Sequence, residues 1–300
     1  MLNPTWPKEI NQNLKGIYVL PKKYQNNVLT ANASFETGKE LRLQSVYTYE
    51  IEKKLNGLGI PLEDLEGKKI LEICSGTGFL SFHVFKLIND ADYIINDIAQ
   101  SELECAQNLL KCHYKDKDFV FLLEDMNELK IENEFDFIIG NSFLHHLTDV
   151  GDSIERLMKL LKPGGAFISL HEPTPTATIV ESKWFFLYPL LLFMPKIYNE
   201  IIRKRSSVKR SDTDLWLFDI KLFYRMCKLR NLNAVKIYRT GILRPMTIER
   251  FKLHLSAVKT NLAYREIRLL KNAIWFDDVL QKFLPNNFFG SFSVCIRKSK

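Results

Sequence analysis

The sequence lacks the features that mark secreted, metal-dependent or membrane-spanning chains. Its five cysteines are odd in number and scattered, without Cys-x-x-Cys spacing, so they predict reduced thiols in the cytosol. No export signal follows Met1, and no cluster of acids has the spacing of metal ligands. The apolar run at 184–195 is shorter than the roughly 20 residues that cross a bilayer. We therefore expect a cytoplasmic chain without a metal, and its 46% hydrophobic content is enough for a large core.

The most informative stretch of the chain is 69–81. An apolar run at 69–73 is typical of a buried strand, and a turn containing Gly76 and Gly78 interrupts it. Apolar residues then recur at helical spacing at Leu80, Val84 and Leu87. Because glycine has no side chain, backbone can pass close to a ligand here, and the helix start offers unpaired N–H groups. The pattern predicts a nucleotide-type binding loop.

Carboxylates stand on either side of this loop. Glu72 precedes it, and Asp97 closes the next strand-like run, nineteen residues after Gly78. In a strand-helix-strand unit, an acid at this distance is placed to accept hydrogen bonds from both ribose hydroxyls. A dinucleotide fingerprint would need a third glycine where Ser81 stands, and the Gly-Lys-Ser/Thr ending of a P-loop is absent. We therefore expect a nucleoside with a small polar tail.

Strand-like and helix-like runs alternate along the rest of the chain. The predicted fold is therefore α/β, with a doubly wound, mostly parallel sheet covered on both faces. Pro163-Gly164-Gly165 is first of all a helix stop and a turn. Further strands are predicted at 118–123, 135–141, 166–170, 234–238 and 288–297, and helices at 102–114, 152–161, 216–218 and 222–229.

The order of these motifs resembles the class I S-adenosylmethionine-dependent methyltransferases over roughly residues 65–173. The resemblance implies a Rossmann-like core with S-adenosyl-L-methionine as cofactor. It also implies a seven-stranded sheet whose last strand is antiparallel. The motifs that carry it are Glu72-x-x-x-Gly76-x-Gly78, Asp97, Asp125-Met126, Asn141 and Lys162-Pro163-Gly164-Gly165.

The resemblance also implies roles for the residues of the loop. Gly76 and Gly78 would pass beneath the methionine part of the cofactor, with Glu72 near its amino group. The chain departs from the family at Cys74, where a further glycine is usual, although cysteine is small enough to be tolerated. Ser75 stands where the family has a small residue, and it completes this part of the predicted site.

The remaining predicted cofactor residues follow later strands. Asp97 would hold the ribose hydroxyls, with Ile98 beside it. Asp125 would accept from the adenine amino group, Met126 would pack against the ring, and Asn141 would bond the methionine portion through its backbone. Taken singly, both aspartates could be turn residues and Met126 an ordinary core residue. Their joint occurrence, each after an apolar run, favours a cofactor site.

Histidines are the predicted catalytic groups. His145 and His146 follow the strand at 135–141, and His171 ends the strand at 166–170 beside Glu172. A hydroxyl nucleophile needs a base, and all four residues are expected at the ligand-binding edge of the sheet. The pair at 145 and 146 has alternative roles, because it could cap the turn or touch the cofactor. Otherwise the enzyme would mainly orient the reactants and exclude water.

Charge divides the chain into two unlike halves. Residues 1–173 carry 18 Lys and Arg against 26 Asp and Glu, whereas residues 174–300 carry 24 against 9. Such a division suggests that the basic half meets something anionic, although solubility explains part of it.

An insertion at 174–214 combines the apolar run with two basic clusters, Arg203-Lys204-Arg205 and Lys209-Arg210. One interpretation is a segment resting at a membrane surface, which would make the protein peripheral there. The other is a cap over the active site, which the position beside the carboxyl ends of the strands favours. Both predict a greasy substrate or one linked to a lipid or an anionic carrier. Nucleic acid is disfavoured, because no binding motif accompanies the arginines.

Four regions are predicted. Residues 1–60 form a helical segment over the cofactor, residues 61–173 the Rossmann-like core, residues 174–214 the cap, and residues 215–300 the rest of the sheet. In the last region, a helical insertion at 247–285 would join a lid or supply a homodimer contact. The N-terminal residues expected to close over the cofactor are Tyr24, Phe35, Arg42, Tyr47 and Tyr49.

The predicted function is S-adenosylmethionine-dependent methylation of a small or lipid-like biosynthetic intermediate, on oxygen or nitrogen. Two alternatives stay open at this point. One is a fold relative that uses the same cofactor for another group transfer or a rearrangement. The other is a non-catalytic binding subunit.

Overall fold

The computed structural model describes residues 44–126, 128–129, 131, 134–147, 149–176, 194, 217–232, 234–243, 247 and 261–300. Most of the predicted cap, with the apolar run and both basic clusters, lies outside these residues. So do Tyr24, Phe35 and Arg42. The expectations about the cap, the membrane surface and the N-terminal closure therefore stay predictions.

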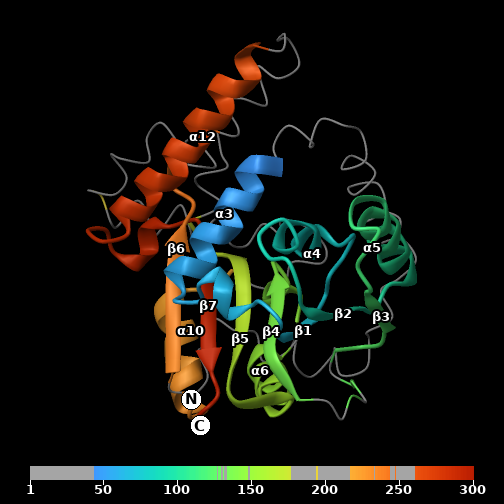
Figure 1. The fold of residues 1–300 in the computed structure, drawn as a ribbon. Coiled ribbons are helices and arrows are strands. Elements are labelled where there is room, and N and C mark those ends of the chain that lie inside the picture. The colour runs from blue at the N-terminus through green and yellow to red at the C-terminus, as the bar shows by residue number, and fades with distance from the viewer. Residues whose placement is uncertain are drawn as a thin grey trace.

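A single seven-stranded sheet forms the centre of the molecule (Figure 1), in the order β3-β2-β1-β4-β5-β7-β6. The first five strands in this order pair in parallel, whereas β7 runs antiparallel to both of its neighbours. This confirms the doubly wound, mostly parallel sheet with an antiparallel last strand. The strands are β1 (Lys69–Glu72), β2 (Asp92–Asp97), β3 (Val120–Leu123), β4 (Phe135–Asn141), β5 (Leu161–Pro173), β6 (Ala234–Thr240) and β7 (Ser291–Arg297).

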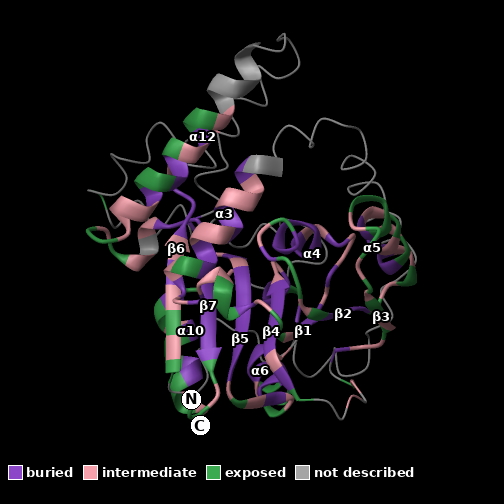
Figure 2. Ribbon diagram, in the orientation of Figure 1, coloured by how far each residue is buried: buried purple, intermediate pink, exposed green. Residues whose placement is uncertain are grey.

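Helices cover both faces of the sheet. Alternate side chains of a strand enter different apolar clusters, because the side-chain period of a strand is two. In β1, Ile70 packs with the helices α3 (Gln44–Gly57), α4 (Phe79–Val84) and α5 (Gln100–His113). Its neighbour Leu71 packs with α6 (Val150–Lys159) and α10 (Ile220–Leu229). The central strands are therefore buried along most of their length (Figure 2).

Several predicted boundaries were wrong, and three of them have a clear structural cause. The helix predicted to include 216–218 begins only at Ile220, because Asp219 caps it by accepting from the N–H groups of Lys221 and Leu222. Strand β5 begins at Leu161, so the predicted turn at 163–165 lies inside it, where its register with β4 shifts. The last strand begins at Ser291 and not at residue 288, since a 3-10 turn occupies Asn286–Phe288.

Helix α12 (Asn261–Leu280) packs against α3 and the end of β6. Its buried Asp277 accepts hydrogen bonds from three consecutive backbone N–H groups after β6, those of Gly241, Ile242 and Leu243. None of the helices in the described ranges is both long and apolar enough to cross a bilayer.

Candidate active site

The loop after β1 takes a left-handed course. Cys74, Gly76 and Gly78 all have positive φ, at 50°, 54° and 80°. A cysteine is strained in this region, so the conformation explains why glycine is usual at this position in the family that the sequence resembles. At Gly76 the space is open, since a Cβ placed there would meet nothing nearer than a Glu102 oxygen at 3.8 Å. The loop therefore presents bare backbone at the carboxyl end of β1.

Asp97 ties this loop to the end of β2. Its Oδ2 accepts from the Gly76 N–H at 2.8 Å, and its Oδ1 accepts from the Ala99 N–H at 2.9 Å. Burial raises the pKa of Asp97, and the backbone hydrogen bonds of Ala99, Gly76 and Ile98 offset part of this effect. A carboxylate has about four acceptor sites, so further donors can bind it. Ile98 lies beside it with 43% of its surface exposed.

The residues predicted to hold adenine lie at the neighbouring strand end. Asn96 Nδ2 donates to the carbonyls of Leu122 and Glu124, which fixes the exit of β3 against β2. Asp125 follows and is half-buried, whereas Met126 is buried with its Sδ 3.5 Å from the Cys74 Sγ. The turn after β3 is therefore in contact with the loop after β1.

Cys74 is at the centre of this arrangement. Burial raises the pKa of its thiol well above the usual range, and the charges of Asp97, Asp125 and Glu172 raise it further. Those three carboxylates come from the ends of β2, β3 and β5, so the fold gathers them around one loop. Asn141, half-buried at the end of β4, precedes Ser142, whose φ is also positive.

Glu72 lies beneath this loop. Its side chain is fully buried, and the Tyr93 hydroxyl donates to its Oε2 at 2.8 Å. Within the described part of the chain, its Oε1 has no hydrogen-bond partner. Glu72 therefore supports the loop from beneath, and its place near the amino group of the cofactor stays a prediction.

Burial raises the pKa of Glu72 to about 7, against smaller opposing effects of Tyr93 and Ser81. Between its ordinary value of 4.5 and about 7, the folded protein holds this proton and the unfolded chain does not. Its contribution to the free energy of unfolding therefore falls as pH rises through this window, by up to about 3 kcal/mol.

We expect Glu72→Gln to flatten this slope and to make the protein more stable than wild type at pH 8. Urea unfolding at pH 5, 6, 7 and 8 measures it. Glu63→Gln is the control, because Glu63 is exposed and should leave the slope unchanged. A wild-type slope in Glu72→Gln would contradict the argument.

Glu172 and His145 form a buried pair at the ends of β5 and β4. Glu172 has no exposed surface, and its oxygens accept from the backbone N–H groups of Phe143, Leu144 and His145 and from the Ser169 hydroxyl. The His145 Nδ1 lies 2.9 Å from Oε2. Burial alone would raise the pKa of Glu172, but these hydrogen bonds, with His145 foremost, hold it below its usual value. An ionised carboxylate therefore orients both the turn and the imidazole.

A bulge in β5 aims these side chains. Between Ser169 and Glu172 the register with β7 shifts, so that Leu170 and His171 together face Ser293. His171 has φ +61°, a position that glycine usually takes in such bulges. As a result Ser169 and Glu172 point to the same side, toward the turn after β4, whereas His171 points to α3. With strict alternation, His171 would share the face of Ser169, and Glu172 would lie on the other face.

The other two predicted histidines have different surroundings. His146 is exposed, and its ring centroid lies 3.9 Å from that of His145. The His171 Nδ1 lies 3.2 Å from the Nζ of Lys54, which pairs with Glu50 on the same helix at 2.7 Å. Lys54 and Glu50 were not predicted from the sequence. Their i,i+4 spacing indicates an ion pair, but no local signal links Lys54 to a histidine 117 residues away.

The residues present fit S-adenosylmethionine at this edge. The open backbone at Gly76, the carboxylate of Asp97 and the half-buried Asp125 converge at the ends of β1, β2 and β3. Here a parallel sheet of this kind binds ligands. No group of three or more His, Cys, Asp or Glu side chains that could hold a metal occurs among the residues described by the structure.

A family comparison agrees with this arrangement. Residues 64–187 match the family model described as "Methyltransferase domain". The chain therefore contains a methyltransferase domain of the S-adenosylmethionine-dependent kind.

Some of the relatives of this chain have names that refer to quinone biosynthesis. The chain is 25% identical over 181 residues to demethylmenaquinone methyltransferase from Lactococcus lactis, a match that covers 59% of this chain and 71% of the relative. It is 24% identical to the ubiquinone/menaquinone biosynthesis C-methyltransferase UbiE of Wigglesworthia glossinidia brevipalpis, over 65% of this chain and 63% of the relative. Among solved structures, the plantazolicin methyltransferase BamL in complex with SAH aligns over 94% of this chain and 92% of that one, at 10% identity and a TM-score of 0.49.

Proposed function

We propose that this methyltransferase acts on a small or lipid-like biosynthetic intermediate and that His145 is its general base. The observation that carries the proposal is the buried Glu172 beside the His145 Nδ1, at 2.9 Å. A carboxylate partner keeps a proton on Nδ1, so the neutral ring has its lone pair on Nε2, where a proton can be received.

When bound, S-adenosylmethionine supplies a methyl group on a sulfonium sulfur. For this cofactor we propose Gly76, Gly78 and Ser75 beneath the methionine part and Asn141 beside it. Asp97, with Ile98 next to it, would hold the ribose, and Asp125 and Met126 the adenine. Glu72 would lie near the amino group of the methionine part, beneath the loop that it supports. The roles of the protein are then to orient the acceptor, to exclude water and to receive on His145 the proton that the acceptor loses.

The acceptor is proposed from the relatives. Two of them carry names of quinone biosynthesis, and one is named a C-methyltransferase. These names support carbon as the methylated atom, beside the oxygen or nitrogen expected from the sequence. A lipid-like acceptor also agrees with the apolar insertion at 184–195.

Contacts with two kinds of partner are also proposed. On α12, Trp275 and Phe276 are about half exposed, and this supports a homodimer contact within the predicted insertion. The contrast between an acidic and a basic half supports an anionic carrier or a peripheral membrane contact.

Binding of S-adenosylhomocysteine tests the cofactor site. We expect Asp97→Ala to weaken binding by about 100-fold, since two hydrogen bonds from ribose hydroxyls to a carboxylate would be lost. Isothermal titration calorimetry measures this, and thermal unfolding checks that the variant is folded. Asp92→Ala is the matched control, because Asp92 is an exposed aspartate at the opposite end of β2.

A ligand analogue separates contact from loop damage. Analogues of S-adenosylhomocysteine without ribose hydroxyls should bind wild type weakly and should lose little more in Asp97→Ala. If Asp97→Ala binds the complete ligand like wild type, the pocket is not used. The reading as a non-catalytic subunit is then favoured if no methyl-labelled product forms in cell extract.

A further inference from the structure

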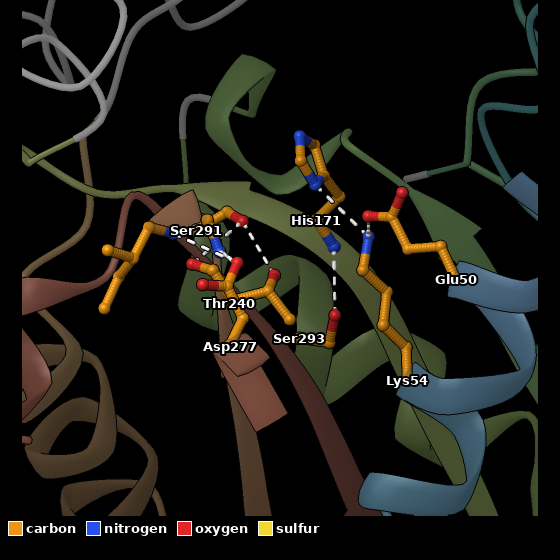
Figure 3. Close-up of polar contacts among 9 residues, drawn as sticks. Glu50, Lys54, His171, Thr240, Asp277, Ser291 and Ser293 are labelled. Carbon is orange, nitrogen blue, oxygen red and sulfur yellow. Dashed lines mark hydrogen bonds and ion pairs between the residues drawn. The ribbon is translucent and has the colours of Figure 1, made fainter. Parts of the chain in front are cut away.

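A buried polar chain joins α3 to the end of β5 (Figure 3). The Lys54 Nζ lies 2.7 Å from the Glu50 Oε1 and 3.2 Å from the His171 Nδ1. Only 3% of Lys54 and 2% of Glu50 are exposed. The His171 N–H donates to the Ser293 hydroxyl at 3.2 Å, which holds the backbone of the bulge. Both sides of His171, ring and backbone, are therefore fixed by residues from other elements.

Lys54 decides where His171 carries its proton. An ammonium group only donates hydrogen bonds, so the His171 Nδ1 next to it must accept. A neutral ring then has its proton on Nε2. The nearby positive charge also opposes a second proton on the ring, and Glu50 balances that charge so that the ammonium can stay buried.

This is the reverse of the arrangement at His145. There the carboxylate of Glu172 lies next to Nδ1, so the neutral ring carries its proton on Nδ1 and accepts at Nε2. The two histidines come from the ends of adjacent strands, β4 and β5. The edge of the sheet thus carries one imidazole prepared to accept a proton and one prepared to donate a hydrogen bond.

The backbone at His171 supports a functional reason for this arrangement. Its φ of +61° is unfavourable for a residue other than glycine, by about 1–3 kcal/mol. Such strain persists where the side chain is needed, because glycine would relieve it. The bulge sends the ring toward Lys54, and this orientation depends on that conformation.

We propose that His171 is a hydrogen-bond donor to an oxygen of the acceptor, held in its Nε2–H form by Lys54 and Glu50 as positioning residues. The acceptor is then a molecule with a hydroxyl or carbonyl oxygen next to the methylated position. His145 takes the proton that the acceptor loses. The Nε2–H of His171 donates to the oxygen of the acceptor on which negative charge develops. This inference rests on the proposed function for its acceptor, but the form of His171 is a property of the protein alone.

¹⁵N NMR of the protein labelled with ¹⁵N-histidine tests directly which tautomer His171 adopts. At pH 7 we expect His171 with a protonated Nε2 and an unprotonated Nδ1, and His145 with the reverse if its ring is neutral. His171→Gln and His145→Gln assign the signals. A proton on the Nδ1 of His171, or on both of its nitrogens, overturns the proposal.

Variants of α3 test the cause. Lys54→Met should release His171 to a mixture of forms and let its ring protonate at a higher pH than in wild type. Lys53→Met, at the neighbouring and more exposed lysine, should leave the spectrum unchanged. Because Lys54→Met leaves Glu50 buried without its ammonium, the double variant Glu50→Gln with Lys54→Met is measured beside it. An unchanged His171 in both variants contradicts the role of Lys54.

A pair of probes tests the donor role. With S-adenosylhomocysteine present, we expect 1-naphthol to bind wild type up to about tenfold more tightly than naphthalene, the effect of one hydrogen bond. His171→Leu should remove this preference, and His171→Gln, which keeps an N–H donor, should retain part of it. Equal binding of the probes to wild type overturns the donor role. Loss of S-adenosylhomocysteine binding would instead count against the proposed function and leave the NMR result valid.

Discussion

Glu172→Gln is expected to lower the free energy of unfolding by about 2–4 kcal/mol and to slow methyl transfer by at least about 100-fold. A carboxylate accepts all five hydrogen bonds at this site, whereas one end of a glutamine amide only donates. The donors that face the amide nitrogen would then lack an acceptor. An amide N–H next to His145 would also draw the ring into the form that cannot receive a proton at Nε2. Urea unfolding and the rate of methyl transfer measure the two effects.

The control for this variant is Glu155→Gln, which removes a carboxylate from the surface of α6. Glu155 pairs with Arg230 in a partly exposed ion pair, so we expect a loss of no more than about 1 kcal/mol. Acid gives a second check. Because the pKa of Glu172 lies below its ordinary value of 4.5, its contribution is complete above that pH and is lost as pH falls through the lower folded value. Equal acid sensitivity of wild type and Glu172→Gln would contradict this account.

Gly78→Ala is expected to destabilise the protein by about 2–5 kcal/mol. Two costs combine at this position. Its φ of +80° is unfavourable for alanine by about 1–2 kcal/mol. The new Cβ would also lie 2.9 Å from the Cβ and 3.1 Å from the Cα of Ala106 in α5, and such overpacking costs about 1–3 kcal/mol. Denaturant unfolding measures the sum.

Gly67→Ala separates these two costs. Gly67 has φ +64°, and no atom lies within 4 Å of the position its Cβ would take. We therefore expect it to show the conformational cost alone, and the difference between the variants is the cost of the contact with α5. Equal losses in both would mean that α4 and α5 can separate freely.

Local patterns in the sequence were sufficient for the alternation of strands and helices, whereas the antiparallel direction of the last strand came from the resemblance to the methyltransferases. Each strand of the core is a short apolar run, and each neighbouring helix has its own spacing or cap. The order of elements could therefore be predicted without tertiary information. Boundaries were harder, because competing interactions decide them. Asp219 moved a helix start, and pairing with β4 drew the predicted turn at 163–165 into a strand.

The candidate cofactor residues could be proposed for the same reason. Gly76, Asp97 and Asp125 follow apolar runs directly, and the carboxyl ends of parallel strands lie along one edge. The position of Glu72 could not be found in this way. Whether its carboxylate faces the edge or the core depends on Tyr93 from the next strand, which covers it.

By itself, the sequence determined the sheet, the glycine loop and the set of polar residues at the strand ends, because these depend on neighbours in the chain. Only the tertiary structure decided how the histidines differ. A bulge against β7 turned Glu172 toward His145 and His171 toward Lys54. The charge beside a neutral imidazole decides which ring nitrogen carries the proton, and those charges come from residues far away in sequence.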